Sequence, residues 1–64
     1  MQVMLPDRSI CTLTGNPVPI YTILEGLGFV RSGVIVVKNG RVVPDDVLAG
    51  GDDLIRIIRV AHGG

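Results

Sequence analysis

The alternation of apolar and polar residues at the start of the chain predicts a β-hairpin. Residues 1–5 are largely apolar, and Pro6-Asp7-Arg8 then brings in side chains typical of a turn. Residues 9–14 alternate polar and apolar side chains, which is the period of a half-buried strand. We therefore expect two strands joined by this turn.

A helical period follows the hairpin. The apolar side chains of one helix face are Ile20, Ile23, Leu24 and Leu27. Pro17 and Pro19 both fit the first helical turn, where a missing N–H group costs nothing. Asn16 would cap the helix if Pro17 is its first residue. Gly26 and Gly28 end the segment, one of them as a left-handed C-cap, so the prediction is a helix of roughly nine or ten residues.

Two valine-rich runs flank Asn39-Gly40, at residues 34–38 and 41–43. This arrangement is the strongest short-range signal for a hairpin, because a type I′ turn needs two positive φ angles. Pro44 stops the second run, which can form only a short strand.

The remainder of the chain predicts a loop and one more strand. Residues 45–51 are expected to form the loop, with one helical turn at Asp46-Val47-Leu48, and the β-branched run 54–60 forms the strand. A single helix must cover one face of one mixed sheet to bury its apolar stripe. The last strand is the most apolar and belongs in the sheet centre, beside the first. The expected fold is therefore α+β, a β-grasp (ubiquitin-like) domain with four or five strands in the order β-β-α-β-β-β.

Composition narrows the classes of function. The 64 residues are 47% hydrophobic, which is ample for one small domain and leaves apolar side chains to face outward or a partner. Six basic and six acidic residues give no electrostatic signature for nucleic acid or an anionic membrane. The single cysteine excludes an internal disulfide, and no signal peptide or membrane-spanning run is seen. We expect a cytoplasmic protein.

The last strand leads into a thin tail that ends on Gly63-Gly64. We divide the chain into a domain at residues 1–60 and a flexible tail at 61–64. Glycine has no Cβ, so the pair can extend through a slot too narrow for other residues. The reactive group would be the Gly64 carboxylate, which ATP must convert to an acyl-adenylate before a sulfide equivalent or a lysine amine can take the acyl group. The other interpretation is a frayed end without chemistry.

With this order of elements and this ending, the chain resembles the ubiquitin-like sulfur carriers of the ThiS and MoaD group and the small archaeal ubiquitin-like modifiers. The matching features are the Asn39-Gly40 hairpin, Gly51-Asp52 before the last strand, Ile57-Ile58-Arg59-Val60 and the terminal glycine pair. The resemblance covers nearly the whole length. The chain departs from it in the proline-rich helix entry at 16–19 and in His62.

The resemblance implies a protein substrate rather than an enzyme. Gly64, preceded by Gly63, would be adenylated by an E1-like adenylyltransferase (ThiF- or MoeB-like) that uses ATP, so the chain itself binds no cofactor. A cysteine desulfurase or rhodanese would supply the sulfur, and the thiocarboxylate would serve a thiazole synthase, a molybdopterin synthase or a tRNA thiolase. One alternative is a modifier joined through Gly64 to lysines of target proteins. Another is a β-grasp binding adaptor with an inert tail.

The last strand has two faces, each with one arginine, so its periodicity does not decide which face is buried. Similarity to ubiquitin places Ile55 and Ile57 inward. Counting from the Asn39-Gly40 turn places Val34 and Val36 under the helix. The outward side chains would form a partner-docking patch that consists of Ile35, Val37, Arg56, Ile58 and Val60.

Other reactive side chains have simpler interpretations. Cys11 is expected to be a small buried hydrophobe, and His62 a solvated linker residue. One histidine and one cysteine make no metal constellation. Lys38 is the only lysine, so a conjugate built on this chain could use only Lys38 or the amino terminus.

Overall fold

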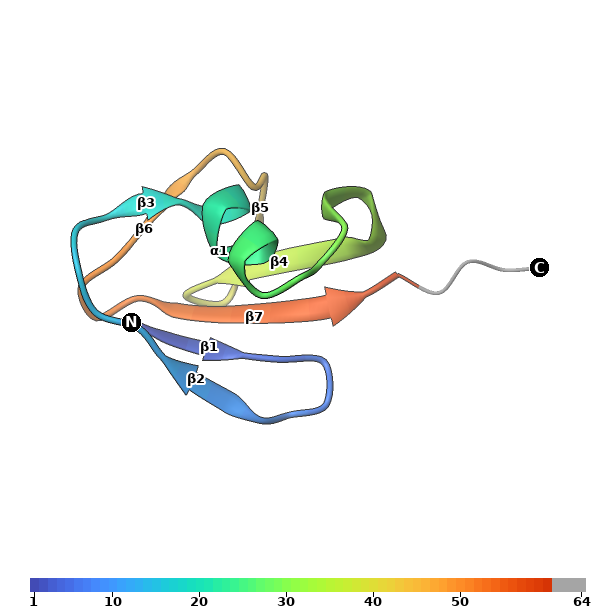
Figure 1. Ribbon diagram of the computed structural model, residues 1–64, viewed down its shortest axis with the longest axis horizontal. Coiled ribbons are helices and arrows are strands. Elements are labelled where there is room, and N and C mark those ends of the chain that lie inside the picture. Colours follow the sequence, from blue (N-terminus) through green and yellow to red (C-terminus); the bar gives the residue numbers. More distant parts are fainter. Residues whose placement is uncertain (61–64) are drawn as a thin grey trace.

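A computed structural model describes residues 1–60 of the chain (Figure 1). Its strands are β1 (Gln2–Met4), β2 (Ile10–Thr12), β3 (Val18–Pro19), β4 (Val34–Lys38), β5 (Arg41–Val43), β6 (Leu48–Ala49) and β7 (Leu54–Arg59). The one α-helix among these residues is α1 (Ile20–Gly26), and a 3-10 turn, η1 (Arg31–Gly33), precedes β4. The predicted tail, with His62, Gly63 and Gly64, lies outside the described residues.

Five strands form one mixed sheet in the order β2-β1-β7-β4-β5. The pair β1–β7 is parallel, and the other three pairs are antiparallel. The last strand therefore lies in the centre beside the first, as predicted, and the helix lies over one face of the sheet (Figure 1). The described chain is a small α+β domain.

The core lies between α1 and the sheet. Its fully buried side chains come from β1, α1, β4, β6 and β7, and they are Val3, Ile20, Ile23, Leu24, Val36, Ala49, Ile55 and Ile57. Ile55 and Ile57 are 2% and 1% exposed, which confirms the inward face expected for the last strand. Leu27, the fourth residue of the predicted helix stripe, is half-buried against the same core.

Both predicted hairpins are present. Asn39 and Gly40 have φ angles of 50° and 84°, the two positive values that a type I′ turn requires. In the N-terminal hairpin, the Leu5 N–H donates to the Ser9 carbonyl at 2.8 Å, so the turn begins where Pro6 was expected to start it. Arg8 completes this turn with a φ of 71°.

The predicted start of the helix is wrong. The helix begins at Ile20, and Pro19 precedes it without any side-chain cap, so Asn16 does not cap the helix and Pro17 is not helical. The first helical N–H groups are satisfied from elsewhere: Ile20 donates to the Val47 carbonyl at 3.0 Å and Tyr21 to the Asp45 carbonyl at 2.8 Å. A distant turn thus replaces the local cap, and the helix has 7 residues.

The predicted helical turn at residues 46–48 is also wrong. Leu48–Ala49 is the short strand β6, which pairs antiparallel with β3 through Val18↔Ala49 and Pro19↔Leu48. The following Gly50 lies so close to Pro17 that a Cβ there would be 2.9 Å from the Pro17 Cα. This close contact explains why the chain uses glycine at the exit from β6.

Of the two candidate C-cap glycines, Gly28 is the left-handed one, with a φ of 82°. Its N–H donates to the Glu25 carbonyl, and the Phe29 N–H donates to the Leu24 carbonyl. These two bonds are the Schellman arrangement that closes a helix end. None of the helices formed by residues 1–60 has the length and apolar character needed to cross a membrane.

Candidate docking face

The sheet face opposite α1 carries most of the large apolar side chains that the domain leaves exposed. Ile55 and Ile57 point under the helix, so the alternating residues Leu54, Arg56 and Ile58 point to the other side. No element formed by residues 1–60 covers this open face (Figure 1). Leu54 is 58% exposed and Ile58 36%, which is unusual for the central strand of a sheet.

Strand pairing brings the predicted docking patch together. Ile35 is the direct cross-strand partner of Ile58, and Val37 is the partner of Arg56. Directly paired residues share a face, so these four side chains form one cluster on β4 and β7. Val60 follows at the end of β7, where its N–H donates to the Gly33 carbonyl at 3.0 Å and continues the ladder. Ile35 is 41% exposed, whereas Val37 and Val60 are half-buried.

The open face extends beyond the five residues of the predicted docking patch. One row crosses all five strands of the sheet in register, and its members are Ile10, Met4, Arg56, Val37 and Val42. Ile10 and Val42 are 58% and 72% exposed. A shallow hollow of about 360 Å³ lies between this row and Leu54. The sequence could have predicted that Val42 lies on this face, because counting from the Asn39-Gly40 turn places it opposite Val37.

Arginines supply the charge around the end of β7. Arg56 is exposed in the middle of the apolar row. A second hollow of about 360 Å³ is lined by Arg8, Arg56 and Arg59, and no acidic side chain of the described residues lines it. The ion pairs found among residues 1–60 lie elsewhere, at Arg31–Asp45 and Lys38–Asp53. The open face therefore combines apolar area with positive charge.

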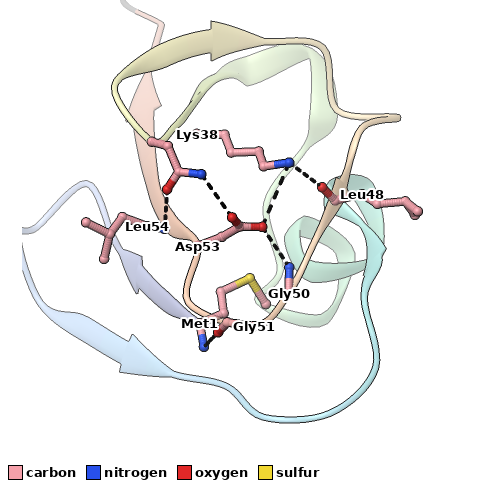
Figure 2. A network of polar contacts seen from close by, with 8 residues as sticks. Met1, Lys38, Leu48, Gly50, Gly51, Asp53 and Leu54 are labelled. Atoms are coloured by element: carbon pink, nitrogen blue, oxygen red, sulfur yellow. Dashed lines mark hydrogen bonds and ion pairs between the residues drawn. The ribbon is translucent and has the colours of Figure 1, made fainter.

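The beginning of β7 is held by side-chain hydrogen bonds (Figure 2). Asp53 accepts from the Asn39 side-chain amide at 2.9 Å and from the Gly50 N–H at 3.0 Å, while the Asn39 Oδ1 accepts from the Leu54 N–H at 2.9 Å. These bonds from Asn39 and Gly50, with a smaller contribution from the Lys38 charge, lower the pKa of Asp53 below its ordinary value of 3.8. The hairpin turn is thereby tied to the start of the central strand.

A second polar contact ties η1 to the turn before β6. Arg31 donates to both carboxylate oxygens of Asp45 at 2.7 Å each, and its guanidinium lies 4.5 Å from the Tyr21 ring centre. The hydrogen bonds from Arg31 lower the pKa of Asp45 and raise that of Arg31. This contact stabilises the turn whose carbonyls cap α1.

The other sequence candidates contribute little to this face. Cys11 is half-buried and packs against the core as the partner of Val3, on the helix side of the sheet. Gly63 and Gly64, with His62, fall outside the described residues.

No protein-family model matches this chain, and no curated protein matches it.

Proposed function

We propose that this chain is a β-grasp sulfur carrier whose Gly64 carboxylate is adenylated by an E1-like adenylyltransferase and then converted to a thiocarboxylate. The observation that carries the proposal is the position of β7 in the sheet and along the chain. The central strand of the sheet is the last element before the glycine pair, and its ladder continues to Val60. The parallel pairing of β7 with β1 and the single helix over one face support the β-grasp assignment.

The length of the tail connects its end to the open face. The four residues that follow Val60 span at most about 14 Å when fully extended. An enzyme that reacts with Gly64 must therefore approach within about that distance of the end of β7. The patch that contains Ile35, Ile58 and Arg56 is the apolar surface nearest to that point on the open face. It is the surface on which we place the activating partner.

The chemistry divides between the carrier and its partners. A Gly64 carboxylate oxygen would attack the α-phosphorus of ATP, pyrophosphate would leave, and an acyl-adenylate would form. A sulfide equivalent would then attack the acyl carbon and expel AMP, which leaves the thiocarboxylate. The carrier contributes only the positioned terminus, and the partner contributes the nucleotide site.

The experiment that tests the proposal is the intact mass of the protein after incubation with ATP, a sulfide donor and host extract. We expect a gain equal to the replacement of one oxygen by sulfur, and no gain when Gly64 is deleted. Lysine-linked adducts without that gain would identify a modifier instead. No change of either kind would leave a binding adaptor and would refute both acyl roles.

A pair of matched substitutions tests the docking surface. Ile58→Asp should abolish adenylation, because it places a charge in the centre of the patch, next to Ile35. Ile10→Asp is the control: the same change on the same face, at a more exposed position on the edge strand β2. Both variants should keep the far-UV circular dichroism spectrum of the parent. Equal loss of adenylation in the two variants would show that the patch is not the docking surface.

A further inference from the structure

Lys38, the only lysine of the sequence, is held inside a polar cluster at the end of β4. Its Nζ donates to the Leu48 carbonyl at 2.9 Å and lies 3.8 Å from a carboxylate oxygen of Asp53 (Figure 2). The side chain keeps only 25% of its surface exposed. Asp53 is itself fixed by Asn39 and Gly50, so the anion beside the ammonium has little freedom to move.

The direction of Lys38 is as informative as its contacts. Lys38 pairs with Ile55 across β4 and β7, and Ile55 is buried under the helix. Directly paired side chains share a face, so Lys38 points to the helix side, away from the open face on which we place the activating enzyme. It also lies at the start of β7, whereas the tail follows the end of that strand. From Ile55 to Val60 the strand rises about 17 Å.

We infer that the fold withholds its only lysine from acyl transfer, so that this protein donates the Gly64 acyl group and does not receive one at Lys38. The inference rests on the proposed function for the identity of the donor. For Lys38 to act as acceptor, its amine would have to reach the activated acyl carbon of Gly64, in this copy or in a second one. The neutral amine of Lys38 would then attack the acyl carbon of the acyl-adenylate, expel AMP, and lose a proton. Before that step, the amine must leave the Leu48 carbonyl.

This position of Lys38 restricts which products acyl transfer from Gly64 can form. A chain of several copies linked through Lys38 would require this polar cluster to open each time. Sulfide, or a lysine of another protein, meets no such barrier. Copies joined through Lys38 are therefore not expected among the products.

The experiment measures the acetylation rate of Lys38 in the folded protein with a limiting amount of an N-hydroxysuccinimide acetate ester, followed by peptide mapping. The substitution R41K supplies an internal reference, because Arg41 is exposed, lies directly across the hairpin from Lys38 and shares its face. We expect the lysine introduced by R41K to react about tenfold faster than Lys38, the factor that one hydrogen bond to a charged group provides. In urea the two rates should become equal. Equal rates in the folded protein would overturn the inference.

Two variants distinguish a specific role of Asp53 from a general loss of structure around Lys38. Asp53→Asn removes the anion beside Lys38 and should raise its acetylation rate toward that of the reference. Asp52→Asn changes the neighbouring, exposed carboxylate and should leave the rate unchanged. The same rise in both variants would show that Asp53 does not hold the amine. The R41K comparison stands even where Asp53→Asn does not fold.

A second arm distinguishes failure of this inference from failure of the proposed function. The R41K protein is incubated with ATP and host extract, and linkages from Gly64 to lysine are mapped. Linkage at the introduced lysine without linkage at Lys38 supports the inference, and linkage at Lys38 overturns it. If Gly64 is never activated, the proposed function fails, and the acetylation rates still decide whether Lys38 is withheld.

Discussion

Ile57 and Ile58 are neighbours in β7 but face opposite environments, and truncating each to alanine should give very different losses of stability. Ile57 is 1% exposed between the sheet and α1, whereas Ile58 is 36% exposed on the open face. Each substitution removes three methylene-sized groups, worth about 2.4 kcal/mol when fully buried, at about 0.8 kcal/mol per group. At Ile57 an enclosed cavity adds to this, so we expect a loss of about 3–4 kcal/mol.

At Ile58 about two thirds of the surface is removed from water, and water can fill the space that the truncation leaves. The expected loss is at most about 1.5 kcal/mol. A domain of this length has a free energy of unfolding of roughly 3–10 kcal/mol, so Ile57→Ala removes a large part of it. The assay is urea denaturation followed by far-UV circular dichroism. With a slope near 1 kcal/mol/M, the midpoint should fall by about 3–4 M for Ile57→Ala and by about 1.5 M or less for Ile58→Ala.

The two slopes must agree with that of the parent, since a changed slope would mean that the unfolded or folded state has changed. If Ile57→Ala does not fold, the milder pair Ile57→Val and Ile58→Val gives the same contrast, with about 1 kcal/mol at Ile57 and less at Ile58. An equal or larger loss at Ile58 would refute the assignment of the two faces. The docking patch would then have no basis.

Three further expectations follow from the geometry. The pKa of Asp53 is lower in the folded state than in the unfolded state, so its carboxylate stabilises the fold at a pH above the unfolded-state pKa. This contribution is lost as the pH falls through the folded-state pKa. Asp53→Asn should therefore reduce the loss of stability that acid titration measures below about pH 4. In Gly50→Ala the new Cβ would lie 2.9 Å from the Pro17 Cα, so this substitution should lower the unfolding midpoint. Gly26 lies in the last turn of α1 with open space around it, so Gly26→Ala should raise the free energy of unfolding by about 0.5–1 kcal/mol. In amide hydrogen exchange, Val60 should be better protected than Arg59, because the Val60 N–H is bonded to Gly33 while the Arg59 N–H points to the side where β1 has ended.

The local signals in the sequence predicted local structure well. The Asn39-Gly40 turn and its flanking strands are present because two positive φ angles are a requirement of the residues themselves. The start of α1 could not be predicted in this way. Asn16 and Pro17 look like a helix cap and first residue, but β3 pairs with β6 there and distant carbonyls complete the helix. Strands of two residues, such as β3 and β6, are too short to show an alternation of apolar and polar residues in the sequence.

The faces of the last strand were ambiguous for a specific reason. Arg56 and Arg59 place one charge on each face, so alternation gave no answer without the resemblance. The structure shows how Arg59 can belong to the face of β7 that lies under the helix. Arg59 is the final residue of β7 and remains exposed, with its guanidinium 5.4 Å from the centre of the Phe29 ring. A charge at the end of a strand costs little desolvation, and only tertiary placement reveals that it lies at such an end.

The two ends of β7 are held by different means, and this difference is compatible with the carrier role that we propose. At the start, β7 is paired on both sides, with β1 and β4, and Asn39 and Asp53 fix the entering chain. The pairing with β1 stops at Arg56, so the last residues are paired only with β4. The least constrained part of the strand is therefore the part beside the tail. A partner docked on Ile35 and Ile58 could draw the chain end into its site without disturbing the buried residues that stabilise the domain.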